Sequence, residues 1–174
     1  MIIKECINFL SDNSKSNIDS IMADSNFAYY MSSSHQENLE YPYLSHIILK
    51  RPEERNHQNF NSPYANLFLK LLEDFQNKNK IKVNQLLRIA VNLTFNFGKK
   101  NSFTHKDHLF EHKQLIIYLN DCDKNSKTVI LNENKKIIKK ITPKKFKGVL
   151  FDCCHHYMIY PKKGYRVIAV YTFT

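Results

Sequence analysis

The sequence predicts a mainly β protein with helices, of the α+β class, in which the strands form a sandwich or a barrel. One observation is that apolar and polar residues alternate from residue 86 onward, as they do in a strand. A second is that five further short runs, rich in β-branched residues, follow and are separated by turn-forming residues. A segment with helical spacing precedes them, which places helices before the strands.

The size of the chain favours one domain. Its 174 residues, of which 43% are hydrophobic and 13% aromatic, suffice for one substantial core. We therefore expect a single domain over 1–174, with a core at about 86–174 and a supporting region of helices and loops at 1–85. No run of eighteen apolar residues and no signal-peptide pattern is present. This predicts a cytoplasmic protein with no membrane partner.

The formal net charge of +10 raises the question of a nucleic-acid partner, because clustered Lys and Arg side chains attract phosphate. The chain, however, is rich in Lys, Asn and Ile throughout and has only three glycines. We attribute the charge to overall composition and rank nucleic acid below a small-molecule or protein substrate. The sequence does not predict the oligomeric state.

The first half of the chain contains one well-marked helix. Residues 11–62 are polar and loop-prone, and the loops in 31–62 are expected to form a lid or to recognise substrate. Ser62 and Pro63 then suggest an N-cap and a first helical turn. The residues that follow recur at the spacing of an amphipathic helix: Leu67, Phe68, Leu71, Leu72 and Phe75.

The second half consists of short strands. Residues 87–96 predict a half-buried strand, because apolar side chains alternate there with polar ones. Further strands are expected at 115–119, 128–131, 137–141, 149–152 and 167–173.

Histidine and aspartate residues fall at the edges of these strands. In an extended segment, residues i and i+2 point the same way, so His105 and Asp107 can bind one ion together. His155 or His156, after a later strand, can complete a set of two imidazoles and one carboxylate. Such a set leaves three positions of an octahedron open and suits non-haem Fe(II) chemistry with oxygen. Taken alone, a His-x-Asp pair is weak evidence, because about 0.4 such pairs are expected here by chance.

The order of motifs around these residues resembles a known family. The stretch 87–173 is similar to the catalytic core of the 2-oxoglutarate/Fe(II) dioxygenases, in particular the small prolyl-hydroxylase-like members of bacteria and phages. The resemblance is carried by the His-x-Asp pair at 105–107, LIIYLND at 115–121, TVI at 128–130, GVLFD at 148–152 and PKKGYRV at 161–167.

This resemblance implies a double-stranded β-helix, or jelly roll, preceded by N-terminal helices. It implies an enzyme that uses Fe(II) and 2-oxoglutarate to hydroxylate a C–H bond of a protein side chain or amino acid, giving succinate and CO2. The implied metal ligands are His105, Asp107 and His156, because Arg166 follows His156 by the ten residues common in the family.

Other residues receive roles by the same resemblance. Arg166 is expected to pair with the far carboxylate of 2-oxoglutarate, and the Tyr118 hydroxyl to hydrogen-bond the same group. His155, His108 and Thr128 are expected to surround these groups, and no catalytic residue is expected beyond the metal ligands.

Two alternatives remain. One is the same chemistry on a nucleic acid, as in a demethylase, which the charge of the chain suggests. The other is a cupin-like module whose histidines bind a metal without catalysis.

Overall fold

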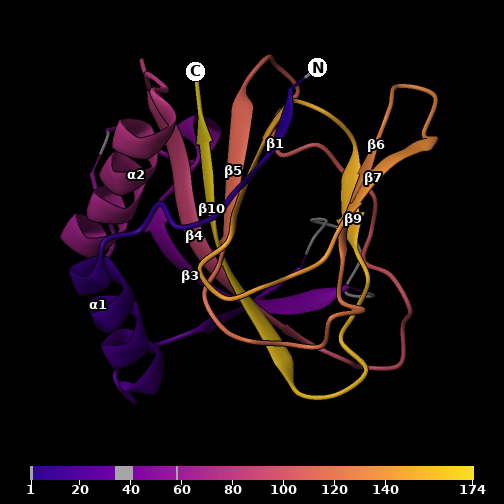
Figure 1. Ribbon diagram of the computed structural model, residues 1–174, viewed down its shortest axis with the longest axis horizontal. Coiled ribbons are helices and arrows are strands. Elements are labelled where there is room, and N and C mark those ends of the chain that lie inside the picture. Colours follow the sequence, from indigo (N-terminus) through magenta and orange to yellow (C-terminus); the bar gives the residue numbers. More distant parts are fainter. Residues whose placement is uncertain (1, 34–40, 58) are drawn as a thin grey trace.

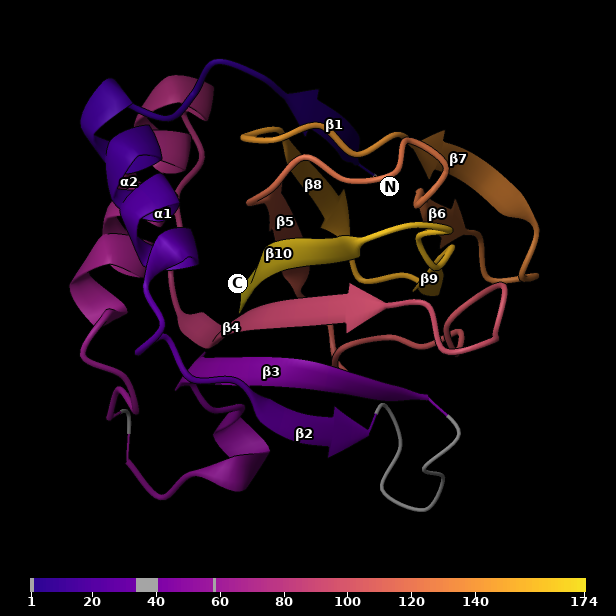
Figure 2. The same cartoon turned by 90° about the horizontal axis from the view of Figure 1, so that it is seen from below.

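The computed structural model describes residues 2–33, 41–57 and 59–174, and its strands form two antiparallel sheets. Two helices cover one face of the larger sheet, and the smaller sheet lies on the opposite side (Figures 1 and 2). The helices are α1 (Asp12–Ala23) and α2 (Ala65–Asn79), and a short 3-10 helix, η1, spans Pro52–Glu54. The strands are β1 (Ile3–Cys6), β2 (Tyr30–Ser33), β3 (Pro42–Leu49), β4 (Leu86–Phe95), β5 (Lys113–Tyr118), β6 (Thr128–Leu131), β7 (Ile137–Ile141), β8 (Gly148–Asp152), β9 (His156–Met158) and β10 (Tyr165–Phe173).

The larger sheet combines strands from both halves of the chain. Its order is β1-β8-β5-β10-β4-β3-β2, whereas the smaller sheet has the order β7-β6-β9. Strand β1 pairs with β8, and β3 pairs with β4. The mainly β, α+β prediction is confirmed. The expectation that 1–85 supplies only helices and loops is wrong, because β1, β2 and β3 extend the sheet at both of its edges.

Alternating side chains of the larger sheet build two separate cores. One face packs Val91 and Ala169 against Phe68 and Phe75 of α2, and the Tyr171 hydroxyl donates to the Phe68 carbonyl at 2.9 Å. The other face lies between the sheets, where the apolar side chains are Ile116, Tyr118, Ile130, Ile141, Val149, Phe151, Cys154, Ile168 and Val170. Strands β5, β8 and β10 are therefore buried on both faces.

Strand β4 is also buried on both faces, contrary to the half-buried strand that its alternation predicts. Its polar residues Arg88 and Thr94 are only 5% and 6% exposed. They face the space between the two sheets and line a cavity there, together with Asn92. The polar side of this strand therefore marks the interior cavity of the protein and not its solvent-exposed surface.

The predicted helix exists but begins later. Helix α2 begins at Ala65, and its N-cap residue is Tyr64, which makes no side-chain cap hydrogen bond. The Ser62 hydroxyl accepts from the Tyr64 amide at 3.2 Å and lies 2.7 Å from Nε2 of His46. Of the predicted strands, β6 and β7 have the expected bounds, and the others agree within two residues.

Residues 11–62 are more regular than their loop-prone composition predicts. They contain α1, β2, β3 and η1, while residues 34–40 and 58 of the expected lid lie outside the described residues. None of the helices that the structure describes has the length and apolar character needed to cross a membrane.

Candidate metal and cosubstrate site

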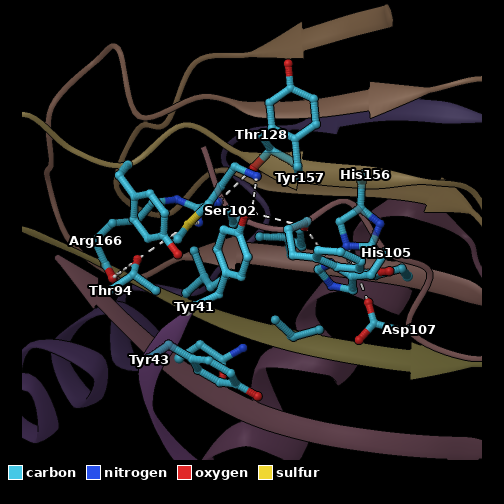
Figure 3. A pocket seen from close by; sticks show the side chains of 18 of the residues that line it. Tyr41, Tyr43, Thr94, Ser102, His105, Asp107, Thr128, His156, Tyr157 and Arg166 are labelled. Carbon is cyan, nitrogen blue, oxygen red and sulfur yellow. Dashed lines mark hydrogen bonds and ion pairs between the residues drawn. The ribbon is translucent and has the colours of Figure 1, made fainter. Parts of the chain in front are cut away.

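The main chain places His105 and His156 side by side. His105 lies in the connection between β4 and β5, and His156 is the first residue of β9. The His105 amide donates to the His156 carbonyl at 3.1 Å, and the His156 amide donates to the His105 carbonyl at 3.0 Å. Their rings lie with centroids 4.5 Å apart at the same end of the cavity as Asp107 (Figure 3). The backbone therefore fixes the spacing of the two imidazoles.

Backbone carbonyls orient both rings. Nδ1 of His105 lies 3.1 Å from the Phe103 carbonyl, and Nδ1 of His156 lies 3.2 Å from the Cys154 carbonyl. Because a carbonyl only accepts, each Nδ1 carries the proton in these contacts and each Nε2 keeps its lone pair. Hydrogen bonding of this kind to the distal nitrogen is what orients metal-binding histidines in proteins.

Asp107 has one occupied and one unpartnered oxygen. Oδ1 accepts from Arg88 at 2.9 Å and lies 3.4 Å from Nη2 of Arg51. Oδ2 is buried without a hydrogen-bond partner and lies 3.5 Å from Nε2 of His156. One donor atom from each of His105, Asp107 and His156 lies within 4.8 Å of the others.

The charge states of these groups suit a divalent cation. Burial on its own would raise the pKa of Asp107, but the neighbouring Arg88, His156, His105 and Arg51 hold it well below its ordinary value. Burial, and then the neighbouring His105, lowers the pKa of His156 to about 4. The site thus offers a carboxylate and a neutral imidazole at neutral pH. A buried carboxylate oxygen without a partner fits a bound metal ion, because an ion satisfies it.

Arg166 lies at the other end of the same cavity (Figure 3). It extends from β10, is 2% exposed, and donates from Nη2 to the Thr128 hydroxyl at 2.8 Å. Nη1 lies 2.8 Å from the Met158 sulfur, and Nε has no partner. The Tyr118 hydroxyl lies 2.7 Å from the same Thr128 oxygen.

This buried guanidinium lacks a counter-ion among the described residues. No carboxylate in the parts of the chain that the structure describes forms an ion pair with Arg166. A buried cation of this kind is suited to an anionic ligand, which a guanidinium binds through two parallel hydrogen bonds.

Solved structures with a similar overall fold are known. An oxidoreductase of the 2OG-Fe(II) oxygenase family from Burkholderia pseudomallei matches with a TM-score of 0.77 and 14% identity, over 99% of this chain and 84% of that one. A prolyl hydroxylase from Trichoplax adhaerens, in complex with a hypoxia inducible factor peptide fragment, matches with a TM-score of 0.66 and 13% identity, over 98% and 83% of the two chains. This chain has the fold of the 2-oxoglutarate and Fe(II)-dependent oxygenases.

The viral collagen prolyl hydroxylase from Paramecium bursaria Chlorella virus-1, in its 2OG complex, shares the oxygenase fold. It matches with a TM-score of 0.59 and 15% identity, over 99% of this chain and 95% of that one. No protein-family model matches the sequence, and neither does any curated protein. The resemblance noted in the sequence is therefore confirmed by three-dimensional structure.

Within the oxygenase fold of this chain, the remaining expected residues lie at different distances from the cavity. Thr128 lines the cavity beside Arg166, and Tyr118 is fully buried behind it. His108 is held by the Thr172 hydroxyl at 2.8 Å and by Glu53 at 3.3 Å, outside the group of metal donors. His155 lies outside that group too, and its carbonyl accepts from the Leu131 amide.

Among the cavity residues that sequence reasoning missed, three contact the metal-donor residues: Arg88, Arg51 and Gln114. Arg88 is one of the polar residues that alternate with apolar ones along β4, so the local pattern does not distinguish it from an arginine that faces solvent. Gln114 places its amide nitrogen 3.4 Å from Nε2 of His156. For Arg51, which precedes η1, no pattern in the sequence indicates a location beside Asp107.

Proposed function

We propose that the protein is an Fe(II)- and 2-oxoglutarate-dependent oxygenase that hydroxylates a C–H bond of a protein side chain or amino acid, with succinate and CO2 as co-products. One observation carries this proposal. The cavity has a set of two imidazoles and one carboxylate oxygen at one end and, at the other, a buried arginine for which the described residues supply no counter-ion. A dicarboxylate that chelates a metal ion through one end needs both features.

Different residues would bind the iron and the 2-oxoglutarate. Nε2 of His105, Nε2 of His156 and Oδ2 of Asp107 would hold the iron, which leaves positions for further ligands. Arg166 and the Thr128 hydroxyl would bind the far carboxylate of 2-oxoglutarate, and Tyr118 would orient Thr128 through their shared hydrogen bond. Bound iron and 2-oxoglutarate together supply the oxidation of the substrate by O2.

The apolar side chains between these two ends would keep water out of the cavity. Ile116, Ile168 and Val170 line the cavity from β5 and β10. They exclude water from the space between Arg166 and the histidines, which strengthens the charge interactions there.

Two structural neighbours support the choice of a protein or amino-acid substrate. One neighbour is a prolyl hydroxylase in complex with a peptide fragment, and another is a collagen prolyl hydroxylase. The proposal also includes a jelly-roll core, a single domain over 1–174 and a cytoplasmic location, as the sequence predicts.

The test is an anaerobic titration of the apoprotein with Fe(II) and 2-oxoglutarate, followed by visible absorption. The wild-type protein is expected to develop the weak charge-transfer band of the iron chelate. Arg166→Ala is expected to need about a hundredfold more 2-oxoglutarate for the same band, because it removes charge-assisted hydrogen bonds. Lys163→Ala, at an exposed position of the same turn, should titrate like the wild type. Iron binding without any band in the wild type would contradict the proposal.

A further inference from the structure

The cavity carries more positive charge than its ligands require. Its described lining residues include three arginines, Arg51, Arg88 and Arg166, and one carboxylate, Asp107. Counting only these arginines and this aspartate, three positive charges and one negative charge leave an excess of +2. A ferrous ion and a 2-oxoglutarate dianion carry equal and opposite charges. The cavity therefore keeps the same excess when both are bound.

Arg51 is the surplus cation beside the metal donors. Arg88 is closer to Asp107, at 2.9 Å, and its side chain is 6% exposed, which makes it the main partner of that carboxylate. Arg51 lies 3.4 Å from the same oxygen, and its side chain is 30% exposed. One carboxylate oxygen neutralises one of these guanidiniums well, so the second keeps its attraction for another anion.

Among the described residues, the surroundings of Arg51 cancel this charge only in part. Glu53 attracts Arg51, but its carboxylate meets His108 at 3.3 Å, is 53% exposed and lies outside the cavity lining, so solvent screens that attraction. Aromatic side chains form the neighbouring wall: Tyr41, Tyr43 and Phe103.

We propose that Arg51 binds a carboxylate of the prime substrate, so that the site selects acidic substrates with an apolar body over neutral or basic ones. The inference rests on the proposed function, since it concerns the same cavity. Its physical basis is that a partly desolvated guanidinium forms strong, directional hydrogen bonds to a carboxylate, whereas a cationic substrate would meet an uncompensated excess of like charge. Arg51 also donates to the Asp107 carbonyl, so its substitution must be separated from an effect on the metal donors.

The experiment uses the full chain loaded with Zn(II) and 2-oxoglutarate, which fills the site without turnover. Isothermal titration calorimetry first measures 2-oxoglutarate binding and then the binding of two probes, N-acetyl-L-phenylalanine and N-acetyl-L-phenylalaninamide. The probes share one shape and differ in one negative charge. We expect the carboxylate probe to bind about tenfold more tightly than the amide, as one charge-assisted hydrogen-bonded contact implies.

Three variants test whether Arg51 causes the preference for the carboxylate probe. Arg51→Gln is expected to bring the affinity ratio of the two probes close to one, and Arg51→Lys to retain part of the preference. Lys50→Gln removes the same charge from an exposed neighbour and should keep the wild-type ratio. If Arg51→Gln does not load 2-oxoglutarate, Arg51→Lys decides, and its ratio must fall below that of the wild type.

The two proposals fail in different ways. A wild-type protein that binds zinc but not 2-oxoglutarate would overturn the proposed function. Binding of 2-oxoglutarate with equal affinities for the two probes, with no binding of the carboxylate probe, or with an unchanged ratio in both Arg51 variants would overturn only the role of Arg51.

Discussion

Asp107 presents its two carboxylate oxygens to different surroundings, and this difference has a chemical consequence. Arg88 holds Oδ1, so Oδ2 alone faces the two histidines. A carboxylate held in this way binds a metal through one oxygen. A carboxylate free to rotate can also bind through both and occupy a position that a cosubstrate needs.

Removal of Arg88 should therefore weaken metal binding. We expect Arg88→Gln to lower the affinity for Fe(II) by about ten- to a hundredfold, the usual effect of losing a group that orients a metal ligand. Arg88→Lys keeps the charge and should restore part of the affinity. Calorimetric titration of the apoprotein under anaerobic conditions measures both. Unchanged affinity in a folded Arg88→Gln protein would show that Asp107 does not need this partner.

Thr128 connects Tyr118 and Arg166, the two groups that we propose to act at the cosubstrate's far carboxylate. Its hydroxyl meets both Tyr118 and Arg166. We expect Thr128→Val to lower the affinity for 2-oxoglutarate about tenfold, since one hydrogen bond to a charged group is lost, and to leave Fe(II) affinity unchanged. Tyr118→Phe should have a smaller effect, because Tyr118 acts through Thr128. The charge-transfer titration compares them, and a larger effect of Tyr118→Phe would reverse this order.

For individual residues, the sequence predicts those that lie in a short motif. It does not predict contacts between residues that are far apart in the chain. The spacing of His105 and Asp107 is visible in three consecutive residues, and Arg166 follows from the family resemblance. Arg88 and Arg51 meet Asp107 across 19 and 56 residues of chain, so only the folded structure brings them together.

The contact between helices α1 and α2 depends on one buried carboxylate. Oδ2 of Asp74 accepts from the Ser11 amide at 2.9 Å, from the Ser11 hydroxyl at 2.9 Å and from the Ser14 hydroxyl at 2.7 Å. These residues form the first turn of α1 and tie it to α2. We expect Asp74→Asn to lower the free energy of unfolding by about 1–3 kcal/mol, measured by urea denaturation.

The same carboxylate should make stability depend on pH. Burial alone would raise the pKa of Asp74, but hydrogen bonds from Ser11 and Ser14 hold it below its ordinary value of 3.8. A group whose pKa is lower in the folded state stabilises the protein fully above its unfolded pKa. That stabilisation is lost as the pH falls through the folded pKa. The stability difference between the wild type and Asp74→Asn should therefore shrink below about pH 3.8, and a constant difference would contradict this account.

Among the elements, the sequence predicts those with strong local periodicity. Strands β6 and β7 and most of α2 are of this kind. Helix α1 was missed because its sequence is polar and its stability comes from Asp74, 60 residues away from Ser14. Strand β9 has only three residues and depends on pairing with β6. The burial of β4 on both faces follows from the position of the smaller sheet, which no local pattern contains.

For the whole molecule, metal binding should raise the melting temperature. A ligand that binds only the folded state adds about 2.7 kcal/mol at a concentration one hundred times its Kd. For a chain of this size we expect the melting temperature to rise by about 5–10 °C with Fe(II) or Zn(II) under anaerobic conditions. Differential scanning calorimetry measures the shift. His105→Ala should show a reduced shift or none, and an equal shift in this variant would place the bound metal elsewhere.

The backbone pairing of His105 and His156 sets the shape of this site, whereas their side chains set its chemistry. Their two hydrogen bonds join backbone atoms, so any side chain except that of proline leaves both donors and both acceptors in place. A single substitution can thus replace an imidazole by a thiolate, a carboxylate or a bound water while the rest of the cavity keeps its form. Such an architecture lends itself to redesign, and it gives evolution a short route from one metal reaction to another on an unchanged scaffold.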